Sequence, residues 1–182
     1  MSQRERIETA ILSVVFIFYI LFLLKLLLFS RVLFSDLFSI QRAQDRSINL
    51  IPFNSIKGYI FSGSGTMQNF SFANVIGNIV VFIPLGTYLA LFKKNRNVLI
   101  NLLVIFIMSF FVEIVQGILA IGSADIDDII LNCLGGLIGI LGYRFLLLIF
   151  RDHKKVHTAI TALSVAGLPV LFYYLFMIKL RL

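Results

Sequence analysis

The sequence is poor in the residues on which soluble domains and small cross-linked domains depend. In 182 residues it has no tryptophan, one cysteine and three prolines, and only 14% of its side chains are charged. Soluble globular proteins carry about 25% charged residues, so the composition excludes an ordinary soluble domain. The single cysteine, Cys133, cannot form an intramolecular disulfide, and no Cys/His spacing typical of a metal site occurs. No cofactor and no metal site of that kind are expected.

The residues that are abundant indicate a membrane protein. Hydrophobic residues make up 59% of the chain, and the nineteen phenylalanines suit helices that face lipid. About 20 apolar residues are needed to cross the ~30 Å hydrocarbon core of a bilayer, and five runs approach or exceed that length. The sequence therefore predicts an all-α integral membrane protein, with one membrane domain and five transmembrane helices. The predicted spans are residues 11–29, 72–92, 98–121, 129–150 and 156–178.

The net charge of +7 is best explained by loops on the cytoplasmic side of a cell membrane. Two short basic segments, KKNRN after the second span and RDHKKVH after the fourth, carry most weight in the positive-inside rule. They favour a cytoplasmic N-terminus and an extracellular C-terminus, and nucleic acid is not expected as a partner. His153 and His157 fall in the second basic segment and are expected to be solvated.

The first extracellular loop is the longest polar connection and begins with an amphipathic pattern. In RVLFSDLFSIQR, Leu33, Phe34, Leu37 and Phe38 share one helical face, with polar side chains on the other face. A short helix with this pattern is expected to lie in the membrane interface.

Polar side chains gather where the third and fourth spans meet, in the stretch MSFFVEIVQGILAIGSADIDDIILNCLGGLIG. Four of the nine acidic residues of the chain are here, and Glu113 lies well inside an apolar run. An ionisable side chain within a membrane segment marks a functional site by default, because its burial is costly. The polar residues of this stretch are Glu113, Gln116, Asp125, Asp127, Asp128 and Asn132.

The predicted topology brings further polar side chains to the same depth of the membrane. Asn74 and Asn78 are four residues apart near the outer end of the second span, and the outer loop carries Arg46 and Asn49. We therefore expect one polar pocket in the outer leaflet.

Glycines on the fourth span extend the polar face. Gly135 and Gly139 continue the helical face of Asp128 and Asn132, and small residues at this spacing allow a close helix contact. We expect the polar top of this face to meet the helix that carries Glu113. The glycines fit an intramolecular contact and a dimer equally well.

Each polar residue also has a simpler interpretation. Asp125, Asp127 and Asp128 precede a helix, where carboxylates accept hydrogen bonds from exposed backbone N–H groups. Capping is favoured for Asp125, whereas capping and a site role are balanced for the other two. The side-chain amides of Asn78, Gln116 and Asn132 could equally well form hydrogen bonds between helices and have no role in a site. Glu113 is the hardest to explain in this way, although a structural ion pair with Arg46 would account for it.

Four motifs in this order resemble the VanZ-like family of membrane proteins over about residues 46–144. They are NLIPF at Asn49–Phe53, GNIVVFIPLG at Gly77–Gly86, EIVQ at Glu113–Gln116 and DIDDIILNCLGGLIG at Asp125–Gly139. The positions that match family motifs are Arg46, Asn49, Pro52, Asn78, Pro84, Gly86, Glu113, Gln116, Asp128, Asn132 and Gly135. The family often has an arginine just before the acidic run, where this chain has Gly122. The resemblance implies an association with resistance to teicoplanin-type glycopeptide antibiotics, and it supplies no mechanism.

Two function classes remain in competition. The first is a non-enzymatic protein that binds a lipoglycopeptide or a lipid-linked envelope precursor in the outer-leaflet pocket. Its binding residues would be Arg46, Asn49, Asn78, Glu113, Gln116, Asp127, Asp128 and Asn132. The second is a membrane-embedded, carboxylate-dependent enzyme acting on a lipid-linked cell-envelope substrate, with Glu113 and Asp128 as catalytic candidates.

The chemistry of the enzyme alternative rests on carboxylates alone. Glu113 would act as a general base, or would bind a divalent cation together with Asp127 or Asp128. A Ser/His pair and an HExxH motif are both missing. A transport role has little support, because the five spans contain no internal repeat. The oligomeric state stays open.

Overall fold

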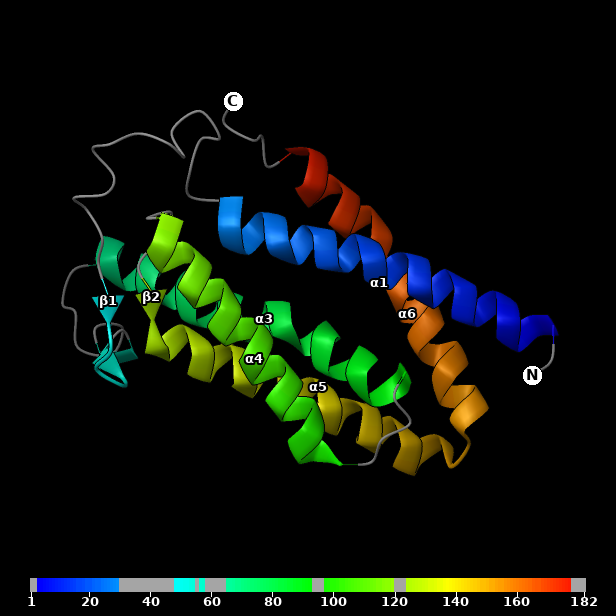
Figure 1. The fold of residues 1–182 in the computed structure, drawn as a ribbon. Helices are drawn as coiled ribbons and strands as arrows, with labels where there is room; N and C mark the ends of the chain where they lie inside the picture. The colour runs from blue at the N-terminus through cyan, green and yellow to red at the C-terminus, as the bar shows by residue number, and fades with distance from the viewer. Residues whose placement is uncertain are drawn as a thin grey trace. The chain divides into compact units, whose positions relative to one another are not determined.

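The computed structural model describes residues 3–29, 48–54, 56–57, 65–92, 97–119 and 124–177, and these ranges are almost entirely helical (Figure 1). Their helices and two short strands follow one another along the chain. In order they are α1 Gln3–Phe29, β1 Ile48–Asn49, α3 Gly65–Phe92, α4 Val98–Leu119, β2 Ala124–Asp125, α5 Ile126–Phe150 and α6 His153–Met177.

The prediction of an all-α membrane protein is confirmed. Within the described ranges, five helices are long and apolar enough to cross a membrane. α1 begins at Gln3 and α5 at Ile126, before the apolar runs that mark their spans, because hydropathy locates the membrane core whereas polar caps locate the helix ends. The expected interfacial helix and Arg46 lie outside the described residues.

The chain forms two compact units, each of which is described by itself. The terminal unit comprises Met1–Phe38 and Tyr143–Leu182, and the central unit comprises Ser39–Gly142.

In the terminal unit, α1 packs against α6. The buried side chains of α1 recur every three or four residues, which gives the helix one buried stripe. They are Leu12, Val15, Tyr19 and Leu23. Polar groups join the same two helices, because Glu8 of α1 accepts a hydrogen bond from Thr158 Oγ1 of α6 at 3.0 Å.

The expectation that both histidines are solvated loop residues was wrong for His157. α6 already begins at His153, so His157 is helical and half-buried, and its Nδ1 lies 3.2 Å from Glu8 Oε2. His153 is exposed, as expected, and its Nδ1 lies 3.4 Å from the Tyr143 hydroxyl.

In the central unit, the glycines of α5 pack directly against the backbone of α3. A Cβ atom at Gly135 would overlap the carbonyl oxygen of Ile79, and one at Gly139 would overlap that of Ile83. Thr87 Oγ1 of α3 also donates to the Gly139 carbonyl at 3.2 Å. The close contact is therefore intramolecular. Its partner is α3. The polar top of the same face also reaches α4, as expected, because Asn132 Nδ2 donates to Ser109 Oγ at 2.8 Å.

The two strands are short and join segments that are far apart in the sequence. β1 and β2 pair in parallel, with Ile48 opposite Ala124 and Asn49 opposite Asp125. Because β2 leads directly into α5, this pairing holds the chain after β1 beside the first turn of α5. The acidic end of α5 therefore has polar backbone within reach.

Candidate functional site

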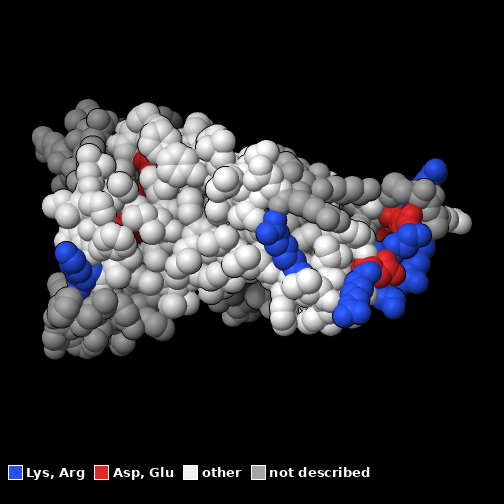
Figure 2. Space-filling view, turned by 90° about the horizontal axis from the view of Figure 1, so that it is seen from below, with Lys and Arg blue, Asp and Glu red and all other residues white. Residues whose placement is uncertain are grey.

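Three buried carboxylates of the central unit form the candidate site. Glu113 of α4 is 6% exposed, and Asp127 and Asp128 of α5 are 0% and 8% exposed. Figure 2 agrees with this burial, since towards its left side acidic atoms appear only as small red areas between white ones. Burying a carboxylate is costly unless hydrogen bonds replace its lost hydration, so the partners of each one explain its position.

Asp128 connects α5 to α3. Its Oδ1 accepts hydrogen bonds from Asn74 Nδ2 at 3.1 Å and from Asn78 Nδ2 at 2.6 Å. The two asparagines are one helical turn apart, so both amides reach the same oxygen from one face of α3. Three polar residues that the sequence placed at one depth therefore do meet.

Asp127 holds the segment that follows β1. Its two carboxylate oxygens accept hydrogen bonds from the backbone N–H groups of Phe53 and Ile56. Phe53 has a φ of 65°, which is uncommon for a bulky side chain and persists only where neighbouring contacts impose it. Asp127 supplies such a contact. It is thus an anchor for a distant loop as well as a first-turn carboxylate of α5.

Asp125 is the helix cap that the sequence indicated. Its Oδ1 accepts a hydrogen bond from the backbone N–H of Asp127 at 2.9 Å, which satisfies one donor of the first turn of α5. Asn49 Nδ2 lies 3.3 Å from both carboxylate oxygens of Asp125, across the strand pair. Asn49 Oδ1 in turn accepts the backbone N–H of Ile51 at 3.3 Å. One asparagine therefore connects the two strands and shapes the turn after β1.

Glu113 connects the end of α4 to β2. Its Oε2 accepts the backbone N–H of Asp125 at 2.8 Å. Gln116 lies about one turn further along α4 and is also buried, at 6% exposure. The proposed partner of Glu113, Arg46, lies outside the described residues, so the ion-pair interpretation stays a prediction.

Asn132 lies one turn below Asp128 and is 1% exposed. Its Nδ2 donates to Ser109 Oγ of α4 at 2.8 Å. Within the part of the chain that the structure describes, Asn132 Oδ1 is buried and has no hydrogen-bond partner. Such an acceptor is expensive to leave unused, because burial removes the water that would otherwise satisfy it.

Ser109 is a buried contributor that the sequence interpretation missed. A serine is unremarkable in an apolar helix, which is why the composition did not mark it. Its position gave a usable signal, since Ser109 is four residues before Glu113 and so shares its face of α4. The buried polar face of α4 thus runs from Ser109 through Glu113 to Gln116.

The cluster combines negative charge with a rigid set of neutral N–H donors. Side-chain amides hold Asp128 and backbone amides hold Asp127 and Glu113, so each carboxylate is fixed by a different segment. Fixed carboxylates in a site of low polarity can bind a cationic or N–H-bearing group, or can accept a proton from a substrate. The arrangement is therefore compatible with two chemistries, ligand binding and proton transfer.

Comparisons with known proteins agree with the motifs. The family model described as VanZ/LLP1 matches residues 16–150, which include every residue of the cluster described above. Protein VanZ of Enterococcus faecium is 31% identical to this chain over 156 residues, covering 86% of this chain and 87% of that protein. No solved structure matches the chain.

Proposed function

Because the chain belongs to the VanZ/LLP1 family, we propose that it is a multi-pass protein of the cell membrane that lowers susceptibility to teicoplanin-type glycopeptides. The buried carboxylate cluster of the central unit would be the part that recognises the drug or the envelope precursor on which the drug acts. Both candidate ligands are amphiphiles, with an apolar tail and a polar head that carries amide or cationic groups.

The observation that carries this proposal is the convergence of α3, α4 and α5 on the cluster. Asn78, Glu113 and Asp128 come from three helices. Glu113 lies near the end of α4 and Asp128 in the first turn of α5, both next to β2, and Asn78 of α3 reaches Asp128 through its side-chain amide. With a cytoplasmic N-terminus, as the basic loops favour, these helix ends lie in the outer leaflet. Glycopeptides meet lipid-linked precursors on that side of the membrane.

The chemistry of the cluster suits a head group that donates hydrogen bonds. Glu113 and Asp128 supply carboxyl groups, and Asn132 Oδ1, which has no partner among the described residues, offers a neutral acceptor deeper in the unit. A hydrogen-bond donor of the ligand would satisfy this oxygen. The apolar surface of the helices would accommodate the tail, as in other largely apolar binding sites with a few polar groups.

The proposal can be tested in cells that express the protein and are challenged with teicoplanin. Glu113→Gln and Asp128→Asn remove the charge but keep the size, and both should return susceptibility to that of cells lacking the protein. Asp152→Asn is the matched control, because Asp152 lies outside the cluster and asparagine preserves its helix cap on Lys154 N–H. Immunoblots must show equal amounts of each variant. Undiminished protection by both cluster variants would refute the proposal.

The burial of Glu113 and Asp128 also supports an alternative, a carboxylate-dependent enzyme acting on a lipid-linked envelope substrate. A buried carboxylate within reach of a substrate proton can serve as a general base, and the amide of glutamine cannot. Purified wild-type and Glu113→Gln proteins should then bind a labelled lipid-linked precursor equally well. Only the wild type should convert it, as seen by chromatography of the lipid extract. Recovery of unchanged lipid with the wild type would exclude this alternative.

A further inference from the structure

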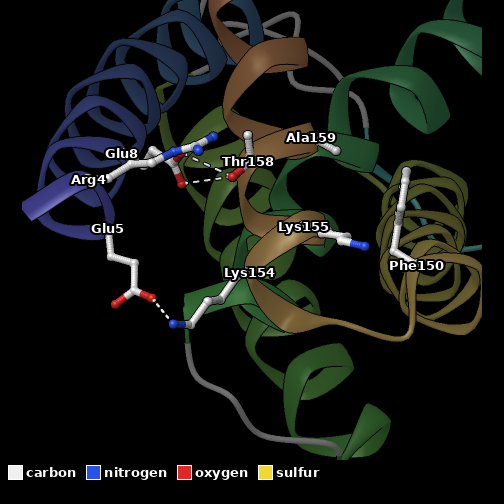
Figure 3. Close-up of a pocket in the computed structure, with 8 residues that line it drawn as sticks. All are labelled: Arg4, Glu5, Glu8, Phe150, Lys154, Lys155, Thr158 and Ala159. Carbon is white, nitrogen blue, oxygen red and sulfur yellow. Dashed lines mark hydrogen bonds and ion pairs between the residues drawn. The ribbon is translucent and has the colours of Figure 1, made fainter. Parts of the chain in front are cut away.

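A second polar region lies in the terminal unit, where α1 and α6 both begin and α5 ends. A pocket of about 420 Å³ opens there (Figure 3). It combines charged side chains from the first turns of two helices with an aromatic side chain and an alanine. Its lining residues are Arg4, Glu5, Glu8, Phe150, Lys154, Lys155, Thr158 and Ala159.

The acidic side chains of this pocket are already engaged by cations and hydroxyl groups. Arg4 Nε lies 2.9 Å from Glu8 Oε1, and Lys154 Nζ lies 2.8 Å from Glu5 Oε1. Glu8 also accepts Thr158 Oγ1 at 3.0 and 3.1 Å. The acidic side chains lie deeper than the basic ones, since the Glu8 side chain is 13% exposed and the Arg4 side chain is 75% exposed. The charge presented outwards is therefore positive.

Lys155 gives the pocket its excess cation. Three cationic and two anionic side chains line the pocket, so one positive charge is left over. Among the described residues no carboxylate pairs with Lys155. Figure 3 shows its side chain extending towards Phe150 and away from the Glu5–Lys154 ion pair. The ammonium group thus borders the apolar side of the pocket, where an anion would be only partly solvated.

Apolar side chains line part of the pocket, and others are exposed elsewhere on the same two helices. Phe150 and Ala159 line one side of it, and Ile7, Ile11 and Leu163 are large exposed side chains further along α1 and α6. A cationic rim at the helix ends beside an apolar helix surface matches the two halves of a phospholipid. Figure 2 shows basic and acidic side chains side by side at the right, where this rim lies.

We propose that this pocket binds the headgroup of an anionic phospholipid. Lys155 and the guanidinium of Arg4 would contact the phosphate, and Phe150 and Ala159 would contact the glycerol and the first acyl carbons. Basic pockets at the cytoplasmic ends of transmembrane helices bind anionic headgroups in this way, and the basic loops favour that side for this pocket. A phosphate would also use the N–H groups of Arg4 that Glu8 leaves available.

The test uses the full-length protein in nanodiscs that contain equal parts of phosphatidylglycerol and phosphatidylcholine, with native mass spectrometry of the lipids it retains. The wild type should retain phosphatidylglycerol in preference. Lys155→Gln should reduce that retention about five-fold, the effect of one basic side chain near an anionic surface. Arg6→Gln is the control, because Arg6 is an exposed cation in the first turn of α1 that does not line the pocket. It should retain phosphatidylglycerol as the wild type does.

Further variants and a competitor make the outcome decisive. Lys155→Arg keeps the charge and should keep the preference, and circular dichroism should be the same for all variants. Equal retention by Lys155→Gln and the wild type would overturn the proposal. So would an equal loss with Arg6→Gln, which would mean a general effect of surface charge. Displacement of phosphatidylglycerol by inorganic phosphate would also overturn it, because the site would then bind a soluble phosphoryl group.

Discussion

Replacing Gly139 by alanine should weaken the packing that holds the carboxylate cluster together. Gly139 lies where α5 crosses α3, and an added Cβ atom would meet the Ile83 carbonyl and the Thr87 backbone nitrogen. Both neighbours belong to helix backbone and cannot rotate away as a side chain would. The two helices must separate, and the hydrogen bond from Thr87 to the Gly139 carbonyl lengthens with them.

Two opposing effects determine how much Gly139→Ala changes the free energy of unfolding. Alanine is favoured over glycine in a helix by about 1 kcal/mol, which stabilises the variant. Overpacking of a well-packed contact costs about 1–3 kcal/mol, and collision with backbone places this site near the upper value. The net expectation is a destabilisation of about 1–2 kcal/mol.

Gly142→Ala provides the matched control on the same helix. Gly142 is exposed and nothing lies within 4 Å of the position of its Cβ atom, so alanine there should gain helix propensity without a clash. The two variants should therefore differ by about 2–3 kcal/mol. At about 2–4 °C per kcal/mol for a chain of this size, Gly139→Ala should unfold about 4–12 °C below Gly142→Ala.

Thermal unfolding in detergent, followed by circular dichroism, measures this difference. The chain has no tryptophan, so helix content is a better signal than intrinsic fluorescence. If Gly139→Ala unfolds at the same temperature as Gly142→Ala or above it, the close contact between α3 and α5 does not exist as described.

Two further predictions concern the polar cluster. Asp127→Ala removes the acceptor for the Phe53 and Ile56 amides, so their hydrogen exchange should accelerate about ten-fold, as expected for the loss of a hydrogen bond to a charged group. Exchange of the Lys154 amide, which Asp152 caps, should be unchanged. Unchanged exchange at Phe53 would contradict the anchoring role of Asp127. In a Cys133→Ser background, Ser123→Cys should react with an impermeant maleimide added to intact cells, because the predicted topology places the loop before α5 outside; reaction only after permeabilisation would reverse the topology.

Local features of the sequence were enough to predict the membrane-spanning helices. A span is recognised by the length and composition of one apolar run, and both are properties of consecutive residues. The same holds for the cap at Asp125, whose acceptor serves an amide two residues away. Helical periodicity likewise placed Asn74 and Asn78 on one face of one helix.

The hydrogen-bond and packing partners of these residues could not be predicted from local sequence patterns. Asp127 accepts backbone amides of a segment more than seventy residues away, and no pattern in either segment specifies the other. The glycines of α5 predicted a close contact, but only the three-dimensional packing identified α3 as the helix that makes it. His157 was assigned to a loop because charge marked it as polar, although it faces Glu8 from within α6.

The sequence by itself determined that this protein is a helical membrane protein with acidic residues near the junction of its third and fourth spans. The length of an apolar run, and a polar residue within it, can each be recognised from a single segment of the chain. The tertiary structure decided that Asp128 is held by α3, Asp127 by the turn after β1 and Glu113 by β2. These pairings depend on which helix faces which. That choice follows from the fit of whole helix surfaces, such as the glycine contact between α3 and α5, and is not contained in any one segment.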